Sequence, residues 1–495
     1  MKYILTGKQM KKTDNHTIEK IGIPSMVLME RAALGVVDVI ENENLDLSNI
    51  LVVCGPGNNG GDGYAVARML HLKGYKVTLF FVGNDSNRTA ENRKQCEIAK
   101  YYEIPVKERL QEEQYTVIVD AIMGTGQSRN IEGEYRTVLE LMNQMSGVKI
   151  AIDMPTGLND QTGDVMGVAL KADLTVALGY MKLGHVLESG NAYVGKITVV
   201  DIGITEDAIP GDEKIAFCYD YEDFKGGFPK RIANSHKGTY GRILLIVGSN
   251  GMSGAALLCA RSAYAVGAGL VRIYTPEENR EILQKLLPEA MVTAYTEYDE
   301  EQLEELLQWA NVIGIGCGLG TSECARKITN YTMLHANTPC VVDADALNLI
   351  SSDLSYLKSK RQPMILTPHM KEMTRLLGCE MSQLREKKVE LLDSFCKEYN
   401  VTCVLKDART LVGNPNENLF LNLTGNSALA KGGTGDVLCG MITGILGQSG
   451  NPYNSACLGV YLHGIAGELA AEQKGQYSVL AGEVIDYIGE ILKQI

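Results

Sequence analysis

The chain has 495 residues, which is too long for one ordinary core, so we expect two or more domains. Hydrophobic residues make up 45% and charged residues 22%, and the net charge of -13 argues against nucleic-acid or anionic-membrane partners, which need basic surface. The 12 cysteines form no C-x-x-C pair, which favours buried free thiols over disulfides or zinc sites. Without a secretory signal or a membrane-spanning run, we expect a cytoplasmic protein.

The first half predicts a parallel α/β unit. Its expected elements, in chain order, are a helix that includes 26–40, a strand at 50–54, a glycine loop at 55–63, a helix through 66–70, and strands at 76–82, 117–120, 149–153, 174–178 and 196–200. Asp120 and Asp153 each end a strand, which is where open α/β sheets place ligand groups.

The pattern restarts near residue 240. Strands are expected at 242–247, 270–274, 312–315, 340–343, 364–366 and 402–405. A loop at 248–254 leads into a helix whose small residues, from Ala255 to Val266, suit close packing on a sheet. The polar, Gly- and Pro-rich stretch between about residues 205 and 238 is the expected domain boundary.

The run from Thr424 to Asp436 has the clearest chemistry. Gly432, Gly433 and Gly435 leave backbone N–H groups bare, and the apolar stripe that follows predicts a helix beginning at Asp436. A glycine loop that opens a helix favours phosphate. An aspartate there would repel phosphate, so it is better explained as a base for a substrate hydroxyl. The alternative is a glycine-rich loop that only packs against a helix.

Three loops of the first half follow strands of one predicted sheet. Residues 58–62 offer amide donors and oxygen acceptors for phosphate, hydroxyl groups or a monovalent cation, and they lack the dinucleotide fingerprint of a Rossmann dehydrogenase. Arg129, within 124–130, could pair with phosphate. The third loop, 153–157, follows the end of another predicted strand and includes Asp153. The alternatives are an Asx-rich turn, a surface loop and a proline turn, so the prediction depends on all three loops sharing one sheet edge.

The second half adds weaker candidates. His369 precedes a predicted helix, and a lone histidine is more often structural than catalytic. Residues 406–410 end a strand with two cations and a hydroxyl, which suits a nucleotide phosphate or, alternatively, a solvated hairpin turn. Asp343 and Asp345 could hold Mg²⁺ through water, although a solvated loop explains them equally well.

Together these motifs resemble the bifunctional NAD(P)H-hydrate repair enzymes, in which an NAD(P)H-hydrate epimerase of the YjeF N-terminal family is fused to an ADP-dependent NAD(P)H-hydrate dehydratase. The order of the motifs matches over nearly the whole chain. The resemblance implies an α/β protein of two doubly wound, three-layer domains, a Rossmann-like epimerase domain at 1–215 and a ribokinase-like dehydratase domain at 225–495.

In the epimerase half, the resemblance implies K⁺ ligands at Asn59, Asp120 and Thr156 and a catalytic Asp153 that touches the hydrated nicotinamide. The implied substrate contacts are Asn58, Asn59, Gly60, Gly61, Asp62, Gly124, Thr125, Gly126, Gln127, Ser128, Arg129, Asn130, Tyr135 and Asp153. Threonine stands at 156 where the family often has serine, and it keeps the oxygen ligands.

In the dehydratase half, Asp436 is the implied catalytic base. The implied substrate contacts are Ala255, Gly318, His369 and Asp436, and the implied nucleotide contacts are Lys406, Asp407, Ala408, Arg409, Thr410 and Gly435. Two residues depart from the family pattern: Asp407 replaces a common glycine, which puts the fine geometry of the adenine-nucleotide site in question, and Cys317 replaces a common proline.

The resemblance implies an isomerase that interconverts the R and S hydrates of NADH and NADPH, and a lyase that dehydrates the S form with ADP and Mg²⁺, leaving AMP and phosphate. We also expect a homo-oligomer. Two rival interpretations are a ribokinase-like small-molecule kinase, which the glycine loop and Asp436 would serve equally well, and a noncatalytic nucleotide sensor in the first half. A Rossmann dehydrogenase is least favoured because the fingerprint is absent.

Overall fold

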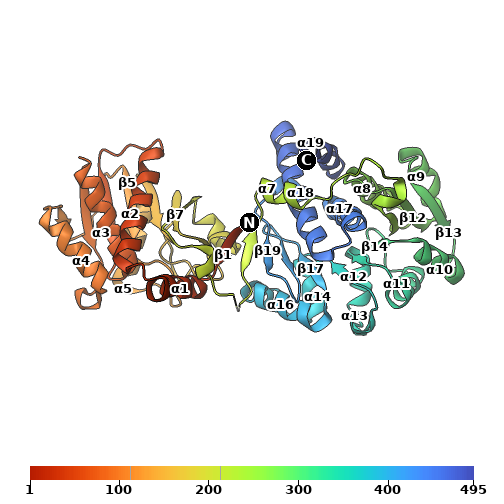
Figure 1. Cartoon of the computed structure of the whole chain (residues 1–495), viewed down its shortest axis with the longest axis horizontal. Helices are drawn as coiled ribbons and strands as arrows, with labels where there is room; N and C mark the ends of the chain where they lie inside the picture. The colour runs from red at the N-terminus through yellow and green to blue at the C-terminus, as the bar shows by residue number, and fades with distance from the viewer. Residues whose placement is uncertain (112, 212) are drawn as a thin grey trace. The chain divides into compact units, whose positions relative to one another are not determined.

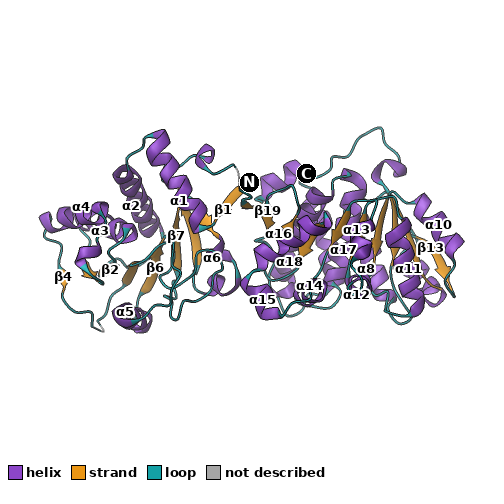
Figure 2. Cartoon of the chain, turned by 90° about the horizontal axis from the view of Figure 1, so that it is seen from below, coloured by secondary structure: helices purple, strands orange, loops and turns teal. Residues whose placement is uncertain are grey.

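The computed structural model describes residues 1–111, 113–211 and 213–495. The chain divides into two compact units, residues 3–216 and residues 217–495, and residues 1 and 2 group with the second (Figure 1). Helices flank the strands in both units (Figure 2). Among the described residues, no helix combines the length and apolar character needed to cross a bilayer.

The amino-terminal unit contains a seven-stranded parallel sheet in the order β4-β3-β2-β5-β6-β7-β9. These strands are β2 (Ile50–Cys54), β3 (Val77–Phe81), β4 (Val106–Lys107), β5 (Val117–Ala121), β6 (Val148–Ile152), β7 (Leu174–Leu178) and β9 (Lys196–Val200). The short strands β1 (Lys2–Leu5) and β8 (Met181–Lys182) pair separately and in parallel. The central strands are apolar on both faces because helices cover both.

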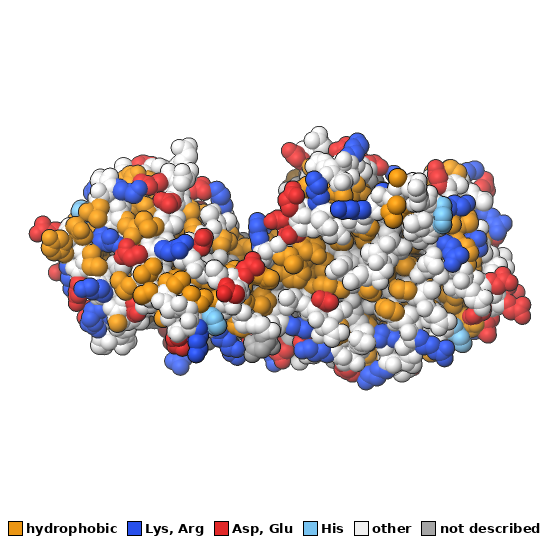
Figure 3. Space-filling view, viewed as in Figure 1, with side chains coloured by type: hydrophobic (Ala, Val, Ile, Leu, Met, Phe, Trp, Pro, Cys, Tyr) orange, Lys and Arg blue, Asp and Glu red, His pale blue; other side chains and the backbone are white. Residues whose placement is uncertain are grey.

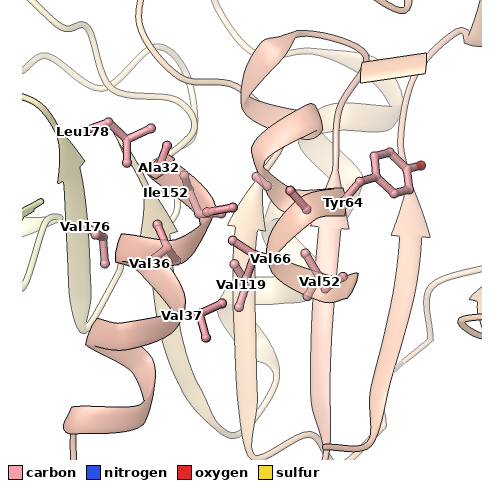
Figure 4. Close-up of a cluster of buried hydrophobic side chains, with 14 of the residues drawn as sticks. Ala32, Val36, Val37, Val52, Tyr64, Val66, Val119, Ile152, Val176 and Leu178 are labelled. Carbon is pink, nitrogen blue, oxygen red and sulfur yellow. The ribbon is translucent and has the colours of Figure 1, made fainter. Parts of the chain in front are cut away.

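The helices of this unit are α1 (Gly7–His16), α2 (Ser25–Asn42), α3 (Asn58–Leu72), α4 (Ala90–Tyr101), α5 (Gly133–Gln144) and α6 (Leu183–Val186). On one face of the sheet, Val36 of α2 and Val66 of α3 pack against Val52 and Val119 (Figure 4). On the other face, α5 packs against the alternate residues of the same strands, such as Leu51. The unit is therefore a three-layer α/β domain, as predicted.

The carboxyl-terminal unit has strands in the order β13-β12-β11-β14-β15-β16-β17-β18-β19. They are β11 (Arg242–Ile246), β12 (Leu270–Pro276), β13 (Met291–Tyr295), β14 (Val312–Ile315), β15 (Cys340–Val342), β16 (Met364–Leu366), β17 (Thr402–Leu405), β18 (Leu411–Gly413) and β19 (Leu419–Leu421). Pairing is parallel as far as β17, and antiparallel for β17–β18 and β18–β19. The strand β10 (Ala216–Cys218) spans the division between the units.

The helices of this unit are α7 (Tyr221–Gly227), α8 (Ser253–Ala265), α9 (Arg280–Leu286), α10 (Glu300–Trp309), α11 (Glu323–His335), α12 (Ala344–Ile350), α13 (Ser355–Ser359), α14 (Met370–Leu377), α15 (Met381–Glu386), α16 (Lys388–Tyr399), α17 (Thr434–Ser449), α18 (Pro452–Lys474) and α19 (Ala481–Leu492). The helices α17 and α8 pack closely, with glycines of α17 against the backbone of α8. A Cβ atom at Gly440 would lie 2.0 Å from the carbonyl oxygen of Cys259, and one at Gly444 would lie 2.6 Å from Val266. These two positions therefore admit only glycine at the observed separation.

Some elements differ from the sequence prediction. The predicted loop at 55–63 is wrong beyond residue 57, because α3 begins at Asn58 and the glycines lie in its first turns. They serve close packing: a Cβ atom at Gly60 would lie 1.9 Å from the carbonyl oxygen of Gly55. The helix predicted at Asp436 begins two residues earlier, at Thr434. Strands β13, β18 and β19 were not predicted from the sequence.

Candidate active sites

The three predicted loops of the amino-terminal unit meet at one sheet edge. They follow β2, β5 and β6, which are adjacent and parallel, so their carboxyl ends lie together. A Cβ atom at Gly124 would lie 3.4 Å from Cγ of Asn59 and 3.5 Å from Oδ2 of Asp153. One residue of each loop therefore borders the same small space, and a glycine at 124 keeps that space open.

Asp153 is held in an unusual conformation at this edge. Its φ of 66° lies in the left-handed region, which is rare for a non-glycine residue and often marks a functional position. Oδ1 accepts hydrogen bonds from the fully buried Lys182 ammonium and from the Leu178 N–H at 3.1 Å. The His185 ring nitrogen Nε2 lies 2.7 Å from the Asp153 carbonyl oxygen. With Oδ1 engaged, Oδ2 is the oxygen that borders Gly124.

Other ionisable groups surround this carboxylate, and the sequence motifs did not reveal most of them. Burial and then Lys182 lower the pKa of His185 to about 4, so its ring is neutral at neutral pH. Burial raises the pKa of Asp14 to about 6, and burial followed by Asp153 raises that of Asp62 well above its usual range. The site thus combines a lysine-paired carboxylate with a second carboxyl group, Asp62, whose raised pKa favours proton binding, and the two can act as base and acid.

Asp120 and Thr156 form a buried oxygen-rich pair, and both are fully inaccessible to solvent. The Thr156 N–H and hydroxyl each donate to Asp120 at 2.7 Å, and the Ile122 N–H donates at 3.1 Å. Among the described residues no cationic side chain pairs with Asp120, and burial raises its pKa to about 6. Both polar atoms of the buried Asn59 amide also lack a hydrogen-bond partner within the described part of the chain. These oxygens fit a hard monovalent cation such as K⁺.

The remaining predicted contacts of this unit divide into two groups. Gln127 ties the loops together, because its amide donates to Gly124 O at 3.0 Å and accepts from the Gly157 N–H at 2.7 Å. Gly126 donates its N–H to the Asp160 carboxylate, which also orders the loop. Asn58, Ser128, Arg129 and Asn130 are exposed, Thr125 and Tyr135 are half-buried, and Gly60 and Gly61 are buried. A separate cavity of about 550 Å³ is lined by Lys149, near the start of β6, and by residues such as Asp173 and Tyr193.

In the carboxyl-terminal unit, Asp436 lies in the first turn of α17. Gly433 caps this helix with a φ of 93°, in the left-handed region that glycine tolerates best. Burial, followed by the nearby charge of Asp343, raises the pKa of Asp436 to about 6. Such a carboxyl group is mostly ionised at neutral pH yet is a stronger base than an ordinary aspartate.

A half-buried cation lies beside the glycine loop. The Lys406 ammonium donates to Oδ1 of Asp343 at 2.6 Å, and it lies 3.6 Å from the position of a Cβ atom at Gly435. Burial opposes the charge of Lys406, but Asp343 and Glu372 outweigh it and raise its pKa. Asp345 accepts a hydrogen bond from the Gly320 N–H at 2.8 Å. Asp343 and Asp345 are thus both engaged, which disfavours them as direct Mg²⁺ ligands.

Residues 406–410 form the turn between β17 and β18, so the predicted hairpin is present. The Lys388 ammonium donates to Asp407 at 2.7 Å, and Thr410 donates its hydroxyl to the Asp407 carbonyl at 3.2 Å. Arg409 donates to Leu423 O at 3.0 Å, and the Ala408 N–H donates to the Asp407 side chain at 2.9 Å. The aspartate at 407, unusual for the resembled family, is thus neutralised by Lys388.

The other predicted contacts border the same region. His369 caps α14. Its ring atom Nδ1 accepts from the Glu372 backbone N–H at 3.1 Å, and its backbone N–H donates to the Glu372 carboxylate at 2.8 Å. The structural role for His369 is therefore present, and its half-exposed ring leaves room for a contact as well. A Cβ atom at Gly318, whose φ is 61°, would lie 2.7 Å from Cβ of Ala255, so these two predicted substrate contacts are neighbours.

Two further features were missed from the sequence. The thiols of Cys259, Cys317 and Cys439 gather within 4.8 Å of one another, and all three are buried. On α18, buried His463 interacts with the Thr434 backbone, and its Nε2 has no partner among the described residues. The cysteines are far apart in sequence, and a single histidine in an apolar helix is no motif, so no spacing rule could have identified either feature.

Comparison with known proteins matches each half of the chain to a family. Residues 25–184 match the family model described as YjeF-related protein N-terminus, and residues 243–490 match the one described as NAD(P)H-hydrate dehydratase. A bifunctional NAD(P)H-hydrate repair enzyme from Moorella thermoacetica is 34% identical, over 100% of this chain and 97% of that protein. The corresponding Escherichia coli enzyme is 31% identical, over 98% of this chain and 92% of its own length.

Solved structures resemble the second unit. The ADP/ATP-dependent NAD(P)H-hydrate dehydratase from Bacillus subtilis, co-crystallised with ATP and Mg²⁺, has a TM-score of 0.50 and 34% identity, over 56% of this chain and 97% of that one. A ribokinase-like superfamily protein from Enterococcus faecalis has a TM-score of 0.52 and 28% identity, over 56% of this chain and 96% of that one. The second unit therefore has the predicted ribokinase-like fold. From the paired family matches and the full-length similarity, the chain belongs to the family of bifunctional NAD(P)H-hydrate repair enzymes.

Proposed function

We propose that this chain repairs hydrated NADH and NADPH in two steps. The domain at 1–215 interconverts the R and S hydrates, and the domain at 225–495 dehydrates the S hydrate with ADP, giving NAD(P)H, AMP and phosphate. The observation that carries the proposal is Asp436, a half-buried carboxylate with a pKa of about 6 in the first turn of a glycine-capped helix. Relatives that are similar over nearly their full length are named bifunctional NAD(P)H-hydrate repair enzymes, which supports the proposal.

In the dehydratase, the difficulty is that hydroxide is a poor leaving group. Asp436 takes the proton of the substrate's C6 hydroxyl while the hydroxyl oxygen attacks the β-phosphorus of ADP. The bond between that phosphorus and the oxygen of AMP breaks. The C6–O bond of the resulting phosphate ester then breaks, phosphate leaves, and loss of the C5 proton restores the ring double bond. Lys406 and the N–H groups around Gly433 and Gly435 stabilise the negative charge on the transferred group.

Mg²⁺ would neutralise charge on the nucleotide phosphates in this domain. Asp343 is occupied by Lys406 and Asp345 by the Gly320 N–H, so we assign neither as a direct ligand. The ion would be held chiefly by the phosphates and water. The adenine nucleotide itself would lie along 406–410 and Gly435, where Lys406 and Arg409 supply positive charge.

In the epimerase, Asp153 is the proposed proton-handling group. Lys182 pairs with it and fixes Oδ1, so Oδ2 faces the space beside Gly124 and Asn59. K⁺ held by Asn59, Asp120 and Thr156 would supply positive charge for the substrate phosphate. Among the described residues, the Asn59 amide has no hydrogen-bond partner and the Asp120 carboxylate has no cationic partner, which supports this assignment.

The decisive experiment is a spectrophotometric assay on mixed hydrate epimers with Mg²⁺ and either ADP or ATP. We expect all of the hydrate to return to NAD(P)H with ADP, and Asp153→Asn to leave the R epimer unconsumed. Survival of both epimers in the wild type would refute the proposal. A phosphorylated acceptor that accumulates with ATP would favour the kinase, and unchanged R turnover in Asp153→Asn would favour a noncatalytic sensor. A cytoplasmic location and a homo-oligomeric state complete the proposal.

A further inference from the structure

Three cysteine thiols converge behind the dehydratase loop. Cys259 lies on α8, Cys317 follows β14 and Cys439 lies on α17, and none of their side chains is exposed to solvent. Their sulfur atoms all lie within 4.8 Å of one another. Within the described part of the chain, this is the one gathering of three or more metal-ligating side chains at such distances.

The spacing suits one soft cation. Three thiolates about 2.3 Å from a central Zn²⁺ would lie roughly 4 Å from one another in a planar arrangement. Cysteine sulfur prefers soft or borderline d¹⁰ ions over the hard cations of the phosphate sites. We propose that Cys259, Cys317 and Cys439 bind a single thiophilic d¹⁰ cation such as Zn²⁺. On binding, each coordinating thiol releases its proton to solvent.

The proposed cation site adjoins the catalytic carboxylates. The Cys317 thiol lies 3.8 Å from Oδ2 of Asp343, and it also interacts with the Asp436 side chain. Cys439 lies one turn after Asp436 on the same helix. Because three sulfurs leave a fourth position open on a tetrahedral ion, either carboxylate can complete the coordination. A bound cation therefore restrains Asp436 or draws Asp343 away from Lys406, and either change inhibits dehydration. This consequence rests on the function proposed above.

Cadmium titration of the reduced, metal-free, full-length protein tests the site, since thiolate-to-cadmium charge transfer is visible in the ultraviolet. We expect uptake of one Cd²⁺ per chain, displaced by excess Zn²⁺. Single Cys259→Ser, Cys317→Ser and Cys439→Ser variants should each bind at least tenfold more weakly. Cys340→Ser is the matched control, because Cys340 is equally buried in the same unit but outside the cluster. Absence of stoichiometric uptake, or equal affinity in all four variants, overturns the proposal.

Circular dichroism establishes which serine variants fold, and one folded cluster variant suffices for the comparison. The second measurement is the ratio of S-hydrate turnover with and without Zn²⁺, taken within each protein. We expect at least a tenfold reduction in the wild type and in Cys340→Ser, and little change in Cys317→Ser. Binding without inhibition would overturn the coupling to Asp436. If the wild type has no dehydratase activity, the proposed function fails, while the cadmium titration still decides the cation site.

Discussion

The pKa of Asp436, raised to about 6 mainly by burial, sets a pH dependence for dehydration. The side chain must be ionised to accept the hydroxyl proton. With this pKa, roughly 90% of the base is ionised at about pH 7 and roughly 10% at about pH 5. We therefore expect kcat at saturating S-hydrate and ADP to fall about tenfold between these two values. An aspartate with its ordinary pKa near 4 would lose only a small fraction over the same interval.

The assay should follow AMP release by chromatography, because reduced nicotinamides decompose in acid and absorbance would mislead. Circular dichroism at each pH would show that the protein stays folded. Asp436→Asn should reduce kcat by about 10²–10⁴ and abolish the acidic limb. Glu372 needs a separate control, because burial raises its pKa to about 7 and it too titrates in this range. Glu372→Gln should retain the fall in kcat at acidic pH. A wild-type kcat that does not change with pH would refute the reasoning, and so would an acidic fall that persists in Asp436→Asn.

Three further predictions concern the rest of the chain. Asp153→Asn should abolish use of the R hydrate but spare the S hydrate, and it should cost about 3–5 kcal/mol because Lys182 stays buried without its partner. Calorimetry should show that adding Lys182→Met restores part of the lost Tm, and recovered R turnover would argue against Asp153 as the proton-handling group. K⁺ should raise the Tm of the wild type relative to tetramethylammonium, but not that of Asp120→Asn; an equal shift in both would exclude Asp120 as a ligand. Gly433→Ala should cost about 1–3 kcal/mol, since alanine is strained at a φ of 93° and its Cβ would lie 2.8 Å from a leucine side chain. Denaturant unfolding should show no such loss for Gly432→Ala, whose Cβ meets nothing within 4 Å; equal losses in the two would mean that backbone strain is not the cause.

Sequence patterns identified those parts of the molecule that depend on local spacing. Apolar runs marked most parallel strands, so the sheet edge with Asp120 and Asp153 could be predicted from the sequence. The start of α3 could not be predicted, because a glycine that permits close packing cannot be told from a glycine that forms a turn by sequence alone. At Gly60 the deciding contact is with the backbone of Gly55, outside the helix that contains Gly60.

Long-range pairings were also beyond the sequence patterns. Lys182 pairs with Asp153 across 29 positions, and the aspartate backbone adopts a left-handed conformation that no sequence pattern indicates. The proximity of Cys259, Cys317 and Cys439 likewise depends on how α8, α17 and the loop after β14 pack. No composition or spacing rule contains that information, so the sequence supported only the statement that these thiols are buried.

Because α17 packs closely against α8, a glycine that takes no part in the chemistry still affects catalysis. Gly440 lies one helical turn beyond Asp436 and has no reactive atom, yet it sets how near the two helices can come. A single methyl group added at Gly440 would push α17 away from α8 and displace the Asp436 carboxylate with it. Substitution of this glycine would thus lower kcat, even where the protein still folds and still binds its ligands.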